Sequence, residues 1–176
     1  MRKIFEIAAP FPVPDGTLIS PFLNSKDTRS GLPFDLLDEV SVAAGVIAPS
    51  TRSKIHVMLF VTQVTFVRRG KLEVWMKSGE DLEPYALHLK DDQAVLTRPG
   101  TFFQIVNNDA EPCQVLYIVS PAYVSEVLNG VEFYEDATVL DESWESLRAA
   151  SWRPSVTFPT WEQRQEALQR LAIRAM

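Results

Sequence analysis

Residues 64–76 read VTFVRRGKLEVWM, and this stretch does most to decide the fold. Within it, Leu72, Val74 and Met76 alternate with charged or amphipathic residues. An alternation with a period of two is typical of a strand that buries one face. Gly70 marks the break between this strand and the run before it. The stretch therefore predicts two consecutive strands with no helix between them.

The same pattern extends in both directions, from about residue 39 to residue 120. We expect strands at residues 39–48, 55–61, 63–68, 71–77, 85–90, 93–97, 101–106 and 114–119. Turn residues such as Pro99-Gly100 fall at the breaks. Roughly eight short strands without intervening helices predict an all-β, antiparallel jelly-roll barrel spanning residues 39–120.

The segments on either side of this region differ from it. Residues 1–38 predict an extended N-terminal arm, because Pro10, Pro12 and Pro14 exclude a central strand. The arm is too apolar for a free tail, so we expect it to pack on the barrel or on a second subunit. Residues 121–176 predict a C-terminal helical extension that packs on the barrel or a partner.

Three parts of this extension favour helix. Residues 121–128 could form one or two turns that end at Asn129-Gly130, and residues 141–148 another. Thr160 followed by Gln163 has the form of a capping box at the start of a helix. On that helix an apolar stripe is expected to cover the barrel or a partner; it comprises Trp161, Leu168, Leu171, Ala172 and Ala175.

Composition narrows the possible functions. The chain has 176 residues and a net charge of −6, which suits a single domain and argues against a dedicated nucleic-acid binder. Its one cysteine, Cys113, leaves no internal disulfide and no cysteine-based zinc site. We see no export signal or membrane-spanning run, so we expect a cytoplasmic protein without membrane or nucleic-acid partners.

Residues 49–120 resemble the cupin family of small β-barrels. The first family motif, G(X)5HXH(X)3,4E(X)6G, falls on PSTRSKIHVMLFVTQVTFVRRG at residues 49–70. His56 and Gly70 match this motif, whereas Ser50, Met58 and Gln63 stand at its first glycine, second histidine and glutamate. The second motif, G(X)5PXG(X)2H(X)3N, falls on DQAVLTRPGTFFQIVN at residues 92–107.

In the second motif Gly100 and Asn107 match, and Phe103 stands at the histidine. The resemblance is to metal-free, single-domain cupins, since aromatics also occupy this position there. It implies that the chain keeps one of the four ligands of metal-binding cupins, His56. Divalent ions prefer imidazole and carboxylate to a thioether, an amide or a phenyl ring, so we expect no metal and no other cofactor.

The resemblance also implies an interior pocket for an apolar or aromatic small molecule. Its expected substrate-binding residues are Met58, Gln63, Phe103, Gln104 and Tyr117. Whether Phe103 or Gln104 faces the interior stays open at this point, because a one-residue bulge would exchange them.

His56 is the candidate catalytic residue, because histidine titrates near neutral pH and suits proton transfer. Glu73 and Asp92 are candidate carboxylate partners for it. A buried structural histidine is the alternative interpretation.

Three functions follow from these observations. The first is a small-molecule-binding cupin, extending to a metal-independent isomerase, cyclase or dehydratase of specialised metabolism. The second is a non-catalytic binding or dimerisation module, and the third a metal-dependent oxygenase or isomerase with a degenerate site. We expect a homodimer in each case, because antiparallel barrels must protect their edges and the arm is long.

Overall fold

The computed structural model describes residues 4–7, 9–13 and 15–176; Pro14 and the basic residues at the start of the chain lie outside them. Within this part, strands form two six-stranded antiparallel sheets and a hairpin. The first sheet has the order β1 (Phe11–Pro12), β2 (Leu18–Leu23), β3 (Ser41–Ile47), β11 (Cys113–Ser120), β6 (Thr62–Arg69), β9 (Ala94–Thr97). The second has the order β14 (Ala137–Leu140), β5 (Ile55–Met58), β10 (Phe102–Asn107), β7 (Lys71–Lys77), β8 (Tyr85–Lys90), with β4 (Thr51–Arg52) beside β10.

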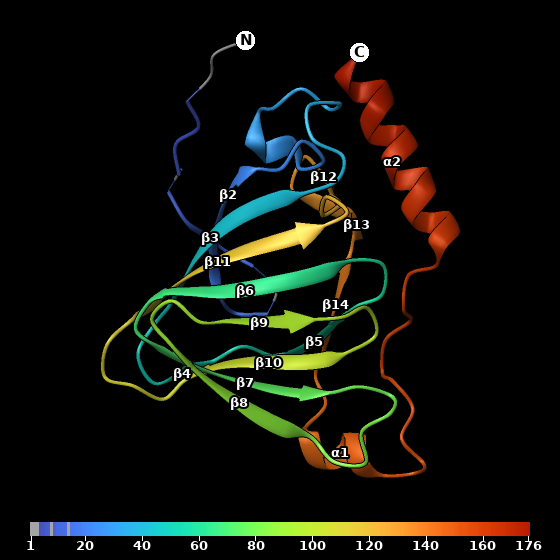
Figure 1. Cartoon of the computed structure of the whole chain (residues 1–176). Helices are drawn as coiled ribbons and strands as arrows, with labels where there is room; N and C mark the ends of the chain where they lie inside the picture. Colours follow the sequence, from blue (N-terminus) through green and yellow to red (C-terminus); the bar gives the residue numbers. More distant parts are fainter. Residues whose placement is uncertain (1–3, 8, 14) are drawn as a thin grey trace.

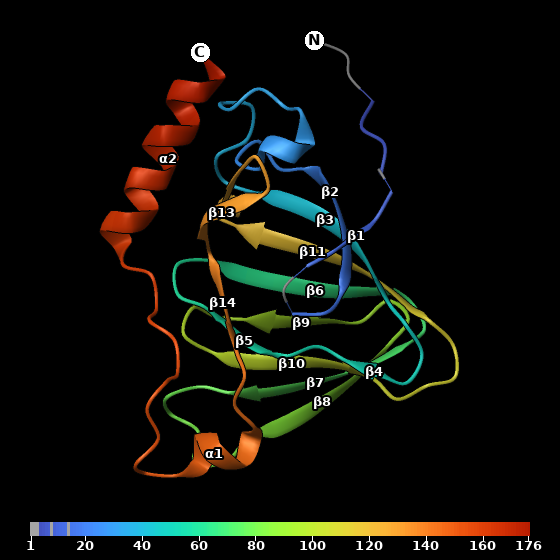
Figure 2. The ribbon, with the colours of Figure 1, turned by 180° about the vertical axis from the view of Figure 1, so that it is seen from behind.

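The main hydrophobic core lies between these two sheets. In β7 the alternating residues Leu72, Val74 and Met76 are buried, and they pack with Val67 of β6 and Val115 of β11. Figure 1 and Figure 2 show the strands stacked across the molecule, with α2 along one side and α1 beside the end of β8. The predicted antiparallel jelly-roll fold is confirmed, and the eight predicted strands correspond to β3 and β5–β11.

The N-terminal arm is part of the first sheet. β2 pairs with β3, from Leu18 opposite Val46 to Leu23 opposite Val42. Pro12 lies in β1 at the outer edge of the sheet, where its missing N–H leaves no gap in a hydrogen-bond ladder. The arm thus packs on its own chain, which was one of the two expected arrangements.

The helical turns predicted for residues 121–128 are wrong. β12 (Ser125–Leu128) and β13 (Val131–Glu135) instead form a hairpin. Asn129 and Gly130 both have positive φ, 50° and 79°, as a two-residue hairpin turn of type I′ requires. The C-terminal segment therefore contributes three strands, including β14, besides α1 (Trp144–Arg148) and α2 (Trp161–Ala175).

Helix α2 packs on the β12–β13 hairpin. Thr160 forms the predicted capping box with Gln163. The residues that α2 buries are Arg164, Ala167 and Leu171, whereas Trp161 at the head of the predicted stripe is 51% exposed. The buried face is therefore narrower than the predicted stripe. Neither described helix has the length and apolarity that crossing a membrane requires.

The α1 region covers the outer side of β5. Ile55 packs with Leu140 and Leu147 in a separate cluster, which Trp144 and Trp152 flank. Because this cover buries the outward residues of β5, all four residues of the strand are buried. Alternation then directs His56 and Met58 towards the space between the sheets.

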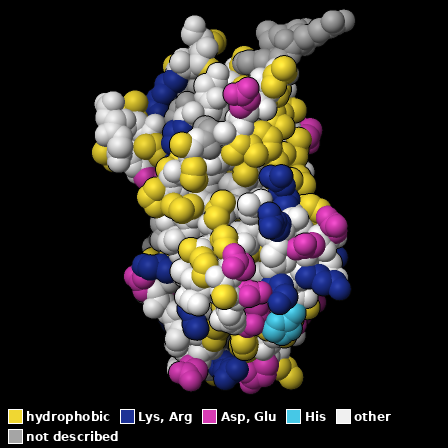
Figure 3. Space-filling view, turned by 90° about the vertical axis from the view of Figure 1, so that its left-hand side faces the viewer, with side chains coloured by type: hydrophobic (Ala, Val, Ile, Leu, Met, Phe, Trp, Pro, Cys, Tyr) yellow, Lys and Arg dark blue, Asp and Glu magenta, His cyan; other side chains and the backbone are white. Residues whose placement is uncertain are grey.

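The outer face of the first sheet has no such cover among the described residues. Leu18, Val46 and Leu96 are 38–50% exposed there, and Leu18 lies directly opposite Val46. Figure 3 shows hydrophobic side chains gathered over the upper part of one side of the molecule, with most charged ones below.

Candidate functional site

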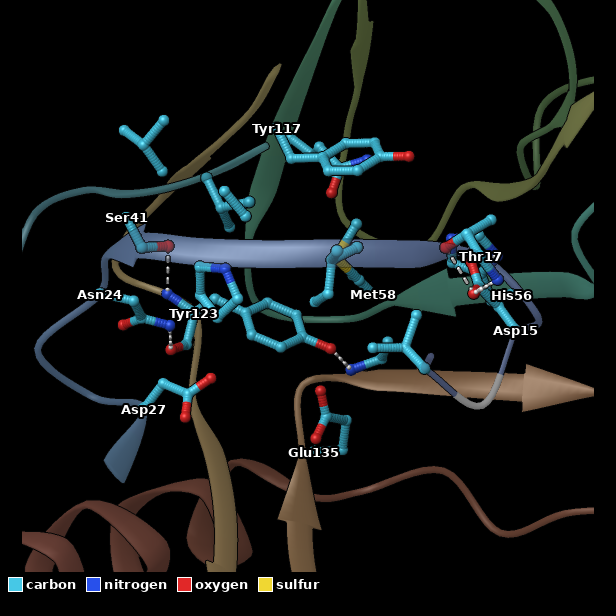
Figure 4. A pocket seen from close by; sticks show the side chains of 18 of the residues that line it. Asp15, Thr17, Asn24, Asp27, Ser41, His56, Met58, Tyr117, Tyr123 and Glu135 are labelled. Carbon is cyan, nitrogen blue, oxygen red and sulfur yellow. Dashed lines mark hydrogen bonds and ion pairs between the residues drawn. The ribbon is translucent and has the colours of Figure 1, made fainter. Parts of the chain in front are cut away.

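A cavity of about 220 Å³ lies between the sheets, partly open to solvent. This is below the roughly 300–1,000 Å³ of pockets that hold drug-sized ligands, so it suits a small molecule. Its middle is apolar and includes Ile19, Pro21, Ala43, Met58, Ile105 and Val119. Polar side chains lie in two regions of the lining. His56, Asp15 and Thr17 lie on one side, which we call the His56 end, and a second group lies around Glu135, below Met58 in Figure 4.

His56 is 7% exposed and lines the cavity. Its Nδ1 lies 3.1 Å from the backbone oxygen of Lys54. A carbonyl oxygen only accepts hydrogen bonds, so this contact requires the proton on Nδ1 and leaves the lone pair on Nε2. Burial lowers the pKa of His56 below 6.5, against the opposing effect of Asp15. The imidazole is therefore neutral at pH 7.

Asp15 is the carboxylate partner of His56. Its Oδ2 lies 3.9 Å from Nδ1 of His56, while its Oδ1 accepts hydrogen bonds from the backbone N and Oγ1 of Thr17 at 2.9 and 2.8 Å. The candidate partners Glu73 and Asp92 are not near His56. Glu73 instead accepts from the Trp75 indole and approaches His88, and Asp92 occupies an exposed turn with a φ of 64°.

Met58, Gln63 and Tyr117 also line the cavity. Gln63 Nε2 donates to Oγ1 of Thr65 at 3.1 Å. The hydroxyl of Tyr117 is buried and has no hydrogen-bond partner among the described residues. Burial raises the pKa of this phenol, so it stays protonated and able to donate. Buried polar groups in proteins nearly always have a partner, which makes this hydroxyl a candidate ligand contact.

Phe103 faces the interior and Gln104 the exterior, because β10 pairs with β7 without a bulge. Phe103 is fully buried with its ring centroid 3.9 Å from that of His56, but it does not line the cavity. Gln104 lies outside the cavity, where it donates to Ser53 O at 2.7 Å and accepts from Trp144 Nε1 at 3.1 Å. The expectation that Gln104 contacts the ligand is therefore at odds with its position.

The part of the cavity around Glu135 was not predicted from the sequence. Glu135 lies there with Tyr123 and Arg29. Its Oε2 accepts from Ser125 Oγ at 2.6 Å, and Ser125 Oγ in turn accepts from Arg29 Nη2 at 3.1 Å. Burial raises the pKa of Glu135 to about 7, despite the hydrogen bonds from Ser125 and Tyr123 that oppose the rise. We call this group the Glu135 end.

Replacing Glu135 by glutamine is expected to stabilise the protein at pH 8. The pKa of its carboxyl group is about 7 in the folded protein, compared with the ordinary value of 4.5 expected in the unfolded chain. The folded state therefore loses stability as the pH rises from 4.5 through 7. Glu135→Gln should therefore gain roughly 1–3 kcal/mol at pH 8 and almost nothing at pH 4.5. Urea unfolding of both proteins at these pH values measures it; a gain that does not depend on pH would contradict this account of Glu135.

Gly45 in β3 gives the Tyr117 ring its space. A Cβ at Gly45 would lie 2.6 Å from Cε2 of Tyr117 and 2.8 Å from Cγ2 of Val115. Gly45→Ala is therefore expected to cost roughly 1–3 kcal/mol by overpacking. Gly79→Ala is the matched control, because nothing lies within 4 Å of that position. Equal melting temperatures for Gly45→Ala and Gly79→Ala would show that the side chains of Tyr117 and Val115 can shift to make room for the added methyl group.

The donor set at the positions of the cupin metal ligands does not fit a divalent ion. Besides His56, the side chains at these positions are the thioether of Met58, the amide of Gln63 and the phenyl ring of Phe103. Divalent ions instead prefer imidazole and carboxylate ligands. Within the described residues, no three histidine, cysteine, aspartate or glutamate side chains are grouped to hold a metal. We therefore assign no metal-dependent step to this site.

No family model and no curated protein matches the chain. Among solved structures, it is similar to an oxalate decarboxylase from Lactobacillus farciminis in a formate complex, with a TM-score of 0.57 and 12% identity over 76% of this chain and 33% of that one. It is also similar to a double-stranded β-helix domain protein from Klebsiella pneumoniae (TM-score 0.51, 16% identity, 75% and 85% covered). A third is Drosophila melanogaster CENP-C bound to CAL1 (TM-score 0.51, 13% identity, 64% and 78% covered).

The chain thus spans about a third of the length of the oxalate decarboxylase. At these identities the likeness shows the fold alone. That fold is the cupin fold, so the fold that the motif spacing implied is confirmed.

Proposed function

We propose that this cupin-fold chain binds a small, largely apolar organic molecule in the cavity between its sheets, and that neutral His56 transfers a proton on it without a metal. The observation that carries the proposal is the buried Tyr117 hydroxyl, which lines an apolar cavity with no partner among the described residues. A polar atom of a ligand would supply that partner. Pockets that are largely apolar with a few polar anchors are typical of small-molecule sites.

The arrangement of His56 supports the proton transfer. With Nδ1–H held by Lys54 O, Nε2 can accept a proton from a C–H or O–H group of the substrate. The imidazolium so formed lies near the Asp15 carboxylate, which would stabilise its charge. Return of the same proton to another substrate atom completes an isomerisation; a cyclisation or dehydration uses the same proton movement.

Blocking the cavity tests the binding step. Ala43 lines it, so Ala43→Leu should fill part of the space while keeping the fold. We expect a library of small aromatic and aliphatic fragments to contain members that raise the melting temperature of the natural protein and not that of Ala43→Leu. Ala150→Leu, at an exposed position after α1, is the matched control and should respond like the natural protein. Stabilisation of all three proteins alike, or of none, would contradict the proposed function.

We also propose a homodimer in which the outer faces of the first sheets meet. Exposed Leu18, Val46 and Leu96 on this face support it, because contiguous exposed apolar patches often mark interfaces. We propose a cytoplasmic location as well, which the single buried thiol of Cys113 supports; burial raises the pKa of this thiol to about 11, so it is not a nucleophile.

Light scattering is expected to give twice the chain mass of 19.8 kDa. The double variant Val46→Lys, Leu96→Lys should yield the monomer, because it places charge in the proposed interface. Leu82→Lys is the control, at a 93% exposed position outside this face, and should remain dimeric. A natural protein that is monomeric at micromolar concentration would refute the dimer.

A further inference from the structure

We propose that the cavity selects ligands that carry an ammonium group, and that this group binds at Glu135 while the apolar body extends towards Tyr117 and His56. The inference rests on the proposed function, since it names the class of molecule that the same cavity takes. It concerns the end of the cavity that the motif spacing left unassigned.

The charges that line the cavity are mostly negative. Arg29 is already paired with Asp27, through Nε to Oδ1 and Nη2 to Oδ2, both at 2.8 Å. Among the described residues, no lysine or arginine forms an ion pair with the three other carboxylates of the lining, Asp15, Glu132 and Glu135. A ligand carboxylate would meet repulsion from these groups, whereas a cation would meet attraction.

Glu135 has the geometry to receive a hydrogen-bond donor. An ionised carboxylate offers about four acceptor sites, and Ser125 and Tyr123 account for two of them. Tyr123 is itself fixed, because its hydroxyl accepts from the backbone N of Ala137 at 3.2 Å. An ammonium group can therefore bind Glu135 without displacing a protein partner.

The energetic state of Glu135 supports a cationic ligand over a neutral one. Burial raises its pKa to about 7, and the repulsion from Glu132 adds to the effect. The nearest cation, Arg29, lowers it only in part. A bound ammonium would supply the missing counter-charge, and hydrogen bonds between charged groups are about twice as strong as neutral ones.

Besides the carboxylates, the Tyr117 hydroxyl also points to a ligand, because it is buried and has no hydrogen-bond partner among the described residues. Figure 4 shows Met58 near the middle of the site, with Tyr117 above it, Glu135 below it, and His56 and Asp15 to one side. A molecule that reaches from Glu135 across Met58 would present its second polar atom to Tyr117 and His56. The predicted ligand is thus a small amine with one further polar group.

Matched probes without the second polar group isolate the selectivity at Glu135: 2-phenylethylamine, 2-phenylethanol and phenylacetate share one apolar body and differ in charge. By calorimetry at pH 8, we expect the amine to bind the natural protein at least about tenfold more tightly than the alcohol, and phenylacetate to bind most weakly. Glu135→Gln should remove the preference for the amine and leave the affinity for the alcohol within about threefold. Glu111→Gln, at an exposed position, is the control and should retain the preference.

The outcomes separate the inference from the proposed function. Equal affinity for amine and alcohol, preference for phenylacetate, or an amine preference that survives in Glu135→Gln would overturn the inference and leave a binding cavity. Failure of all three molecules to bind would count against both. Amine affinity should also fall between pH 8 and pH 6, as Glu135 gains a proton beside Arg29, Glu132 and Tyr123, while alcohol affinity stays constant.

Discussion

Replacing Asp136 by alanine is expected to lower the free energy of unfolding by on the order of 3–5 kcal/mol. Asp136 is fully buried and pairs with the buried Arg164 of α2, whose Nε and Nη2 lie 2.9 and 3.2 Å from its two oxygens. It also accepts from the backbone N of Val124 at 2.8 Å and from the Tyr134 hydroxyl at 2.9 Å. Removing the carboxylate leaves the Arg164 cation buried without its partner, and an unpaired buried charge destabilises the folded state strongly.

Urea unfolding followed by circular dichroism measures this cost. Glu83→Ala is the control, because Glu83 forms an exposed ion pair with Arg148 at 2.6 Å, and exposed pairs contribute within about 1 kcal/mol. Asp136→Asn, which keeps one acceptor, should fall between the two. An Asp136→Ala variant as stable as Glu83→Ala would show that this network does not hold α2 to the hairpin.

The network also bears on the site. Asp136 follows Glu135 directly, so its hydrogen bonds fix the backbone from which the Glu135 side chain enters the cavity. The proposed ligand site is therefore supported by the contact between α2 and the β12–β13 hairpin.

His56→Gln is expected to lower turnover by about 10²–10⁴-fold, the usual contribution of a general acid or base. Glutamine is similar in size to the neutral imidazole and is also polar and uncharged, so the fold should persist, but it cannot accept and return a proton near neutral pH. Chelators should leave the turnover by the natural protein unchanged. Full turnover by His56→Gln would show that His56 is only a packing residue. If the natural protein binds its ligand without converting it, the protein is a binding module.

The protonation state of His56 can be measured separately. Its pKa is lowered by burial, so its contribution to stability is fully present above pH 6.5 and is lost as pH falls below that value. Proton NMR should show its imidazole titrating below 6.5, and a His88→Gln variant assigns the resonance, because the two histidines are the only ones in the chain. Titration above 6.5 would indicate that Asp15 outweighs burial, and that His56 is charged rather than a neutral base.

Much of the fold could be predicted because local signals agree with tertiary packing. The alternation of Leu72, Val74 and Met76 corresponds to a strand whose buried face meets the core, and the capping box at Thr160 starts a helix. The β12–β13 hairpin was missed, although Asn129-Gly130 is a strong hairpin signal. Its strands are short and lack a clear alternation, so the turn was interpreted as a helix end.

The site was less predictable because it joins distant segments. Motif spacing predicted that His56, Met58 and Gln63 face the interior, since strand alternation fixes which residues point inward, and all three line the cavity. Asp15 belongs to the arm, where Asp15-Gly16 indicated only a turn, and Glu135 ends β13, a strand that was not predicted. No pattern along the chain links either carboxylate to the cavity; the position of Asp15 depends on the pairing of β2 with β3, and that of Glu135 on the pairing of β12 with β13.

Crystals of the natural protein soaked in a fragment library show whether the space between the sheets is a small-molecule site. We expect fragments in the cavity between Met58 and Ala43, with a polar atom within hydrogen-bond distance of the Tyr117 hydroxyl and amines enriched at Glu135. Fragments found solely on the outer surfaces, with the cavity holding only water, would contradict the proposed function.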